Sequence, residues 1–504
     1  MLGAWQGGTM RARLPLLTIL GTLAFFCVLF VLSSDQTQNF RHRLAPVGSS
    51  SNGTEALPLP SIYDQDSSDN QLSSLCAERY GSQYIRKFSS TATNMCESHS
   101  KSSLTCFTHK AWDRSTDTFC TGTDATIDPK QRSVFMDCSL HNFTRDEKNL
   151  EKHADMVDTI PESWYATGPR YLFDKFMVLN GSSEVGRSSK DSSKERIVLL
   201  VKREGGKVIS NVWHVFMQMM SLWVSLDIMQ STIDPETGRP LYTENDIKKT
   251  QVVILDEDPD GAFYELWNMF GALPTIRLRN SPRLESSKVL VPISGGSNPI
   301  WQSKDVVLPC KDSSLLRAFS QRILDFYGVD VAAPRRSKLN LIWIDRTEKR
   351  MLVDQIKHLT SLRALLAERY PEIHFESVDF ANFTLREQIE KIRSTDILVG
   401  VHGAGLTHTM FLPPNSTVVE IQPPGLKYFG FESMAKLLGH GYFQEYGYFQ
   451  TYEGMKHNWQ LDNVFVKEDR FLKVIEQAIN LRVWTDSDEQ RRLGYPTIPA
   501  DNGT

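Results

Sequence analysis

The stretch 395–423 combines residue types that can hold a negatively charged group. It reads TDILVGVHGAGLTHTMFLPPNSTVVEIQP, with an apolar run at 397–401, a turn that carries two glycines, and a second apolar run that contains Glu420. A strand, a tight turn and a helix start leave backbone N–H groups pointing outward, and their partial positive charge stabilises an anion. We therefore predict that the backbone amides of this turn hold a diphosphate, in the segment Gly403, Ala404, Gly405 and Leu406.

Two polar residues flank this turn and suit the rest of a nucleotide. His402 can donate a hydrogen bond to a phosphate or ribose oxygen. Glu420, on the next strand, can accept hydrogen bonds from ribose hydroxyls, as the acid does in dinucleotide folds. The alternative is an ordinary glycine turn in an α/β sheet without a ligand, because the third glycine of the dinucleotide fingerprint is missing.

Two arginines supply the charge that a leaving diphosphate needs. Arg346 ends the run LIWIDR, and Arg350 follows four residues later, about one helical turn away. Guanidinium groups at this spacing can point to the same side and neutralise phosphate oxygens. The alternative is a pair of surface arginines at the start of a helix.

His214 is the first candidate for a general base. It lies in the apolar helical stretch 208–223, VISNVWHVFMQMMSLW, where a histidine by itself is more often a core residue. Facing an acceptor hydroxyl it can take up the proton, because imidazole titrates near neutral pH. Asp227 and two acids of LDEDPDG, Asp256 and Asp258, compete for this role, and we keep Asp258 as the second catalytic candidate.

The same acidic stretch raises the question of a metal. Asp256, Glu257 and Asp258 fit a DxD pattern, which can hold a divalent cation such as manganese on a pyrophosphate. An ordinary acidic turn before Pro259 and Gly261 explains the residues equally well. The sequence leaves metal dependence open.

Three pieces of the chain together resemble glycosyltransferase family 61. The segment 399–421, VGVHGAGLTHTMFLPPNSTVVEI, follows the C-terminal motif of that family almost position by position. The pieces Asn211-Val212-Trp213-His214 and Asp345-Arg346, followed by Arg350, fall in the family's order and rough spacing. The resemblance covers about 196–484, and the residues after Arg350, MLVDQ, depart from an Asn-containing tract of the family.

The resemblance implies a fold and a reaction. The fold is α/β and GT-B-like, with two Rossmann-like domains facing a cleft. The reaction is inverting, and it moves a sugar, xylose or N-acetylglucosamine, from a UDP-sugar donor to a glycan or glycoprotein acceptor. Two other classes stay open: a non-catalytic luminal protein that binds a nucleotide or glycan, and an NAD-dependent oxidoreductase, which fits poorly because the glycine turn lies near the C-terminus.

Hydrophobic periodicity predicts the elements that position these residues. Strands are expected at 197–201, 252–255 and 289–291, and again at 339–344 and 374–378; helices are expected at 351–370, 385–393 and 468–484. We divide this body into an N-terminal, acceptor-side domain (76–334) and a C-terminal nucleotide-sugar domain with its tail (335–504). The formal charge of −4 provides no basic field, so we expect no nucleic-acid partner.

The N-terminal residues predict a membrane anchor. The stretch 14–32 is nineteen residues long without a charge, enough to cross a bilayer, and longer than the apolar core of a cleaved signal peptide. We expect a cytoplasmic tail (1–13), the anchor (14–32) and a stem (33–75), disordered over 35–71 because Ser, Asn, Asp and Pro dominate there. This order places a single-pass type II protein in the Golgi or endoplasmic reticulum membrane, with a luminal body.

Cysteines and glycosylation sequons agree with a luminal body. Six of the seven cysteines follow the predicted span, which allows three disulfides; five lie within 76–138 and predict a stapled subdomain, to which Cys310 must reach back. Their spacing does not match a zinc site. We expect N-glycans at the sequons of Asn52, Asn142, Asn180, Asn382 and Asn502, and none at Asn415, which lies inside the nucleotide motif.

Overall fold

A computed structural model describes the body of the chain. It covers residues 57, 59–63, 73–112, 115–143, 157, 159–162, 164–180, 195–307, 309–330, 338–448 and 458–492. Within these residues no helix combines the length and apolarity needed to cross a bilayer. The predicted tail (1–13) and anchor (14–32) lie outside them.

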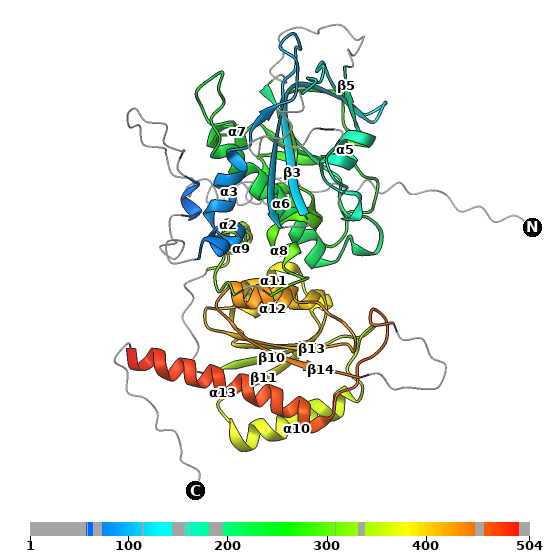
Figure 1. Cartoon of the computed structure of the whole chain (residues 1–504). Helices are drawn as coiled ribbons and strands as arrows, with labels where there is room; N and C mark the ends of the chain where they lie inside the picture. The colour runs from blue at the N-terminus through cyan, green and yellow to red at the C-terminus, as the bar shows by residue number, and fades with distance from the viewer. Residues whose placement is uncertain are drawn as a thin grey trace, which may run out of the picture. The chain divides into compact units, whose positions relative to one another are not determined.

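A mixed sheet of nine strands organises the first half of the body (Figure 1). Its main order is β1-β2-β3-β9-β6-β7-β8. The strands are β1 (Thr93–Asn94), β2 (Leu104–Trp112), β3 (Ser115–Asp128), β9 (Leu284–Val291), β6 (Ile197–Val201), β7 (Thr250–Ile254) and β8 (Leu273–Arg277). Two short strands, β4 (Ser133–Met136) and β5 (Met177–Leu179), extend from β3. The strands β9, β6, β7 and β8 run parallel, whereas β1, β2 and β3 pair antiparallel.

The helix α6 (Val212–Gln230) is the central helix of this half. Asn211 caps it, its side chain accepting a hydrogen bond from the Trp213 amide, as a good N-cap residue does. Nearly every side chain from Phe216 to Met229 is buried, which is why the helix is apolar all round. The remaining helices of eight or more residues are α3 (Ser82–Ser89) and α9 (Ser314–Tyr327), and the shorter ones include α2 (Ser74–Tyr80), α5 (Pro169–Lys175), α7 (Glu244–Ile247) and α8 (Pro299–Gln302).

A fully parallel sheet of five strands organises the second half, in the order β11-β10-β12-β13-β14. The strands are β10 (Asn340–Ile344), β11 (His374–Val378), β12 (Ile397–Val401), β13 (Thr417–Gln422) and β14 (Gly441–Tyr446). The helices α10 (Gln355–Arg369) and α13 (Glu468–Arg492) pack on one face of this sheet and share its core, while α11 (Leu385–Arg393) and α12 (Gly430–Leu437) lie on the other (Figure 1). Such a doubly covered parallel sheet binds ligands at the carboxyl ends of its strands.

The strand and helix predictions are largely confirmed. The strands at 197–201 and 374–378 and the helix at 385–393 have the predicted bounds. The helix expected from 351 begins only at Gln355, because Arg350 and Asp354 adopt left-handed backbone conformations, with φ of 53° and 55°, that no α-helix accommodates. The strands expected at 197–201, 252–255 and 289–291 correspond to β6, β7 and β9, and β6 runs parallel to both of the others. No strand was predicted for β1–β3, which pair antiparallel.

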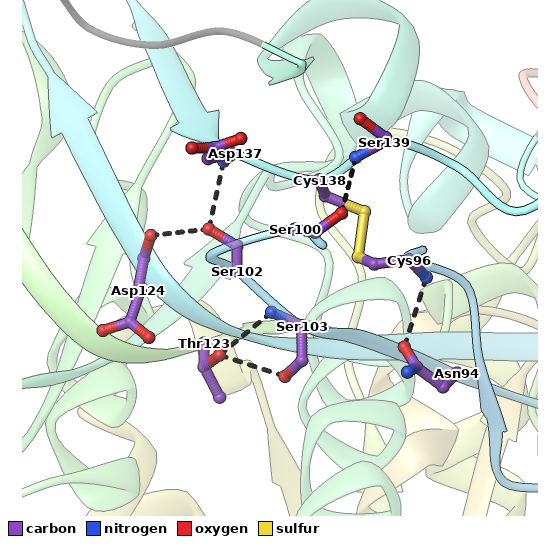
Figure 2. The surroundings of a disulfide bond; sticks show 10 residues. All are labelled: Asn94, Cys96, Ser100, Ser102, Ser103, Thr123, Asp124, Asp137, Cys138 and Ser139. Atoms are coloured by element: carbon purple, nitrogen blue, oxygen red, sulfur yellow. Dashed lines mark hydrogen bonds between the residues drawn. A yellow bond between two sulfur atoms is a disulfide. The ribbon is translucent and has the colours of Figure 1, made fainter. Parts of the chain in front are cut away.

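The six cysteines form three disulfides, as predicted. The pairing, which the sequence left open, is Cys76–Cys310, Cys96–Cys138 and Cys106–Cys120. Cys310 does reach back to the cysteine-rich segment. Two of the disulfides staple the cysteine-rich segment, and β3 pairs along its length with β9, so this segment is part of the main sheet. Serine hydroxyls brace the loops around Cys96–Cys138 (Figure 2): Ser102 donates to the Asp124 carbonyl and accepts from the Asp137 amide.

One part of the predicted stem is ordered against the body. Ser61–Tyr63 forms a helical turn, and Tyr63 is buried. Its hydroxyl donates to Asp227 at 2.7 Å, and the same carboxylate forms a two-point ion pair with Arg322 of α9 at 2.7 and 2.8 Å. The prediction of disorder over all of 35–71 is therefore wrong, because Tyr63 is held by its hydrogen bond to the buried Asp227–Arg322 ion pair.

Candidate functional site

The two predicted arginines lie beside each other at the carboxyl end of β10. The Arg346 side chain donates from Nε to the Lys349 carbonyl at 2.9 Å, and within the described residues neither arginine forms an ion pair with a carboxylate. Burial lowers the pKa of both guanidinium groups, and for Arg350 burial and the neighbouring Arg346 together lower the pKa to about 10. Two half-buried like charges without a carboxylate partner form an environment that favours an anion.

The glycine turn approaches Arg346 closely. A Cβ on Gly403 would collide with the Arg346 guanidinium, and one on Gly405 would lie 3.1 Å from the Ile344 side chain. Neither glycine has a left-handed φ, so the closeness of neighbouring side chains, rather than backbone freedom, favours glycine at both positions. The helical turn η11 (Ala404–Phe411) begins directly after Gly403, and its first two N–H groups, those of Ala404 and Gly405, have no carbonyl partner within the helix.

Leu406 is a correction to the predicted amide set. Its N–H donates to the Gly403 carbonyl at 2.9 Å, and its side chain is fully buried. The amide is engaged because the turn tightens into a 3₁₀ helix, whose hydrogen bonds close one residue earlier than in an α-helix. The predicted amides are thus reduced to Gly403, Ala404 and Gly405.

His402 and Glu420 form a pair inside the protein. Nδ1 of His402 and a Glu420 carboxylate oxygen lie 2.5 Å apart, and Tyr442 donates its hydroxyl to the other oxygen, also at 2.5 Å. Glu420 is completely buried, so the predicted hydrogen bonds to ribose would require one of these partners to leave. The sequence placed Glu420 correctly on the strand beside His402, but the register of β12 and β13 turns its carboxylate towards His402.

Aromatic residues that the sequence did not single out surround His402. Its ring lies 4.9 Å from Tyr428, 5.3 Å from Phe431 and 6.0 Å from Trp459. The Arg350 guanidinium lies 5.8 Å from the centre of the Trp459 ring. No sequence motif contains Tyr428 or Trp459, and only the fold brings them to the glycine turn.

The same aromatic cluster reaches the predicted base in the first half of the body. Trp213 lies 6.0 Å from Tyr428 and 5.3 Å from Phe431. His214 is the next residue, in the first turn of α6. The histidine expected from one motif and the arginines expected from another therefore belong to one continuous set of contacts.

His214 is neither a core residue nor a freely exposed one. Its Nδ1 is hydrogen-bonded to Glu204, and its side chain is 12% exposed. Tyr165 and Trp301 contact the ring edge to face, with centroids 4.8 and 5.2 Å away. Tyr165 is exposed and has a left-handed backbone, with φ of 64°, a conformation that is costly for a bulky residue and that often marks functional sites.

Two of the three acids that compete with His214 are held in buried ion pairs. Asp256 is buried in a two-point ion pair with Arg203, and Asp227 is buried in its pair with Arg322. The Asp258 carboxylate accepts from the Gly206 amide at 3.4 Å.

These positions also weaken the DxD interpretation. Glu257 pairs with Arg132, so the three acids point to different partners, and the described residues contain no group of three or more metal-ligating side chains. The buried partners of Asp256 favour an acidic turn over a cation site.

The sequons fall on the surface wherever the structure describes them. Asn142, Asn180 and Asn382 are exposed, and so is Asn415. Asn52 and Asn502 lie outside the described residues.

The segment that contains most of these residues is similar in sequence to known proteins. Residues 212–419 match the family model described as glycosyltransferase 61. The chain is similar to the EGF domain-specific O-linked N-acetylglucosamine transferase of Drosophila melanogaster, 27% identical over 216 residues, which cover 42% of this chain and 38% of the fly protein. It is 28% identical over 123 residues to the Rattus norvegicus protein of that name, 24% of this chain and 23% of the relative. It is 30% identical over 125 residues to the Xenopus laevis protein of that name, which covers 24% of this chain and 23% of the frog protein.

The chain thus spans less than two fifths of the length of these relatives in each match. His214, Arg346, Arg350 and the turn after His402 all fall inside the matched segment. The resemblance inferred from the sequence is confirmed, and the segment 212–419 belongs to glycosyltransferase family 61.

Proposed function

We propose that this protein is an inverting glycosyltransferase that moves a sugar from a UDP-sugar to a hydroxyl of a glycan or glycoprotein. The observation that carries the proposal is the continuous cluster from His214 to Arg350. It joins a histidine beside an exposed tyrosine to two arginines that have no carboxylate partner within the described residues, through Trp213, Tyr428, His402 and Trp459.

The residues divide into two tasks. Arg346, Arg350 and the amides of Gly403 to Gly405 hold the diphosphate and stabilise the charge that develops as it leaves. His214 accepts the proton of the acceptor hydroxyl, so that the oxygen attacks the anomeric carbon from the face opposite the leaving group. His402, held by Glu420, orients a phosphate or ribose oxygen.

The donor and the setting complete the proposal. Xylose and N-acetylglucosamine are the donor sugars that we expect, and the named activity of the similar fly, rat and frog proteins favours the second. Three disulfides and exposed sequons support a luminal body in the secretory pathway. We further propose a GT-B arrangement of domains 76–334 and 335–504, and a type II anchor at 14–32 in the Golgi or endoplasmic reticulum membrane. A divalent cation is not part of the proposal, because the acids of the DxD pattern have other partners.

A donor panel tests this function. The purified full-length protein is incubated with UDP-xylose, UDP-N-acetylglucosamine, UDP-glucose and UDP-galactose, and with glycoprotein acceptors, and product linkage is analysed. We expect transfer from one donor with inverted configuration at the anomeric carbon. UDP binding without transfer from any donor would instead identify a non-catalytic nucleotide-binding protein, and absence of both would contradict the proposal entirely.

A further inference from the structure

The histidine assigned as the base has a buried carboxylate on one of its two ring nitrogens. Glu204 follows β6, ten residues before His214, and no motif in the sequence contains it. Its carboxylate is hydrogen-bonded to Nδ1 of His214, and its side chain is 3% exposed against 12% for the histidine. The partner that does not face solvent is therefore the glutamate.

The surroundings hold Glu204 in one position. Gly295 of the turn η9 (Gly295–Ser297) packs against it so closely that a Cβ there would lie 3.1 Å from Oε1 of Glu204. Within the described residues this Oε1 has no hydrogen-bond partner, so His214 is the side chain that satisfies the carboxylate. Leaving a buried carboxylate without a hydrogen bond is costly. A carboxylate with a single partner therefore holds that partner in the orientation that keeps the hydrogen bond.

The surroundings also hold the imidazole. Tyr165 and Trp301 contact its ring at 90° and 69°, which leaves little freedom to rotate. A small pocket is lined by both His214 and Glu204. Within the described residues Nε2 of His214 has no hydrogen-bond partner.

We infer that Glu204 is a positioning residue, which keeps the proton of neutral His214 on Nδ1 and so presents Nε2 as the base. A carboxylate accepts hydrogen bonds only, so Nδ1 must be the protonated nitrogen. The inference rests on the proposed transferase activity. It adds a residue and a tautomer that the sequence motifs do not supply.

The proton step follows from this tautomer. As the acceptor oxygen forms its bond to the anomeric carbon, the bond from that carbon to the phosphate oxygen breaks, and its electron pair leaves with UDP. The hydroxyl proton passes to Nε2 of His214. The Nδ1 proton remains on the imidazole, and the negative Glu204 stabilises the imidazolium that forms.

Kinetics of Glu204→Gln test the inference in the full-length protein. Glutamine fills the same space but offers its oxygen or its NH₂ group, so the tautomer is no longer fixed. We expect kcat to fall at least about tenfold, up to the roughly 10²–10⁴-fold cost of removing a general base. KM for the donor and the UDP dissociation constant should stay within about twofold of the wild-type values, because Glu204 does not contact Arg346 or Arg350. Glu204→Asp, which retains the charge, should recover part of the loss.

The matched control is Glu285→Gln on β9, a partly exposed glutamate that accepts from Thr126 at 2.8 Å, and it should leave kcat unchanged. A Glu204→Gln enzyme with wild-type kcat, or one whose loss lies in donor binding, would overturn the inference while the transferase function stood. A wild-type protein that transfers no sugar would remove the function and the inference with it.

Proton NMR of the unliganded protein gives a second readout. A proton shared between imidazole and carboxylate is strongly deshielded, and the described residues contain two buried pairs of this kind, His214–Glu204 and His402–Glu420. The third histidine–glutamate pair, His141–Glu97, is exposed, with 3.3 Å between the two atoms. We expect one downfield resonance to disappear in both Glu204→Gln and His214→Ala, while the other survives in both and is lost in His402→Ala. Survival of both resonances in Glu204→Gln would refute the assigned hydrogen bond, whatever the activity shows.

Discussion

Arg350→Met is expected to change UDP affinity and ligand-free stability in opposite directions. In the folded protein Arg350 lies beside Arg346, its Nε has no hydrogen-bond partner within the described residues, and the charge is partly desolvated. Methionine keeps an unbranched side chain against Trp459 and removes the charge. The variant therefore loses an anion contact and also loses an unfavourable buried charge.

The magnitudes follow from the pKa and from hydrogen-bond energetics. A hydrogen bond to a charged group contributes about 1.5–3 kcal/mol, which corresponds to a rise in Kd for UDP of roughly 10- to 150-fold. Burial and Arg346 lower the pKa of Arg350 from the usual value of a guanidinium group to about 10. Because the folded pKa lies below the unfolded one, folding disfavours the charged form at every pH below about 10, at up to about 3 kcal/mol. Partial exposure reduces this figure, and we expect the free energy of unfolding to rise by about 1 kcal/mol without UDP.

Calorimetric titration with UDP and urea unfolding with and without saturating UDP measure both effects. Arg363→Met is the matched control, because Arg363 lies over the Phe375 ring at 5.1 Å but is exposed and belongs to no site. It should alter neither UDP affinity nor the effect of UDP on stability. Wild-type UDP affinity in Arg350→Met, or a ligand-free variant less stable than wild type, would show that the two arginines are structural rather than anion-binding.

Three further changes test the description. Gly403→Ala should displace the Arg346 guanidinium and weaken UDP binding at least about tenfold with the fold retained, by calorimetry and circular dichroism; unchanged affinity would exclude the close approach as functional. Burial lowers the pKa of His408 from 6.5 to about 4, so the unfolded chain takes up the proton first and the free energy of unfolding falls as the pH drops from 6.5 towards 4. His408→Asn should remove this fall, which amounts to up to about 3 kcal/mol. Identical pH dependence of the unfolding free energy in wild type and variant would contradict the prediction. Tyr63→Phe should lower the free energy of unfolding by about 1–2 kcal/mol in urea titrations without changing UDP affinity, and no loss would mean that the ordered stem turn does not stabilise the body.

Local pattern was sufficient for most of the elements and for the positions of the glycine turn and the two arginines. The apolar runs at 197–201 and 374–378 identify their strands because a buried parallel strand needs apolar residues on both faces. The glycine turn and the arginines that follow β10 could be placed from the sequence because each directly follows a strand, which sequence order reveals.

Tertiary structure decided which residues meet. Antiparallel pairing of β3 with β9, two segments more than a hundred residues apart, drew the cysteine-rich stretch into the main sheet. The partners of His214 and His402, the burial of Glu420 and Asp256, and the arrival of Trp459 beside Arg350 all depend on side-chain direction and on contacts between distant segments. Hydrophobic periodicity shows which secondary structure a segment forms and which of its side chains are buried. The partner of each buried charged side chain depends instead on contacts between distant segments of the folded chain. For that reason the sequence alone indicated which charged residues to consider, but not which side chain each of them pairs with inside the protein.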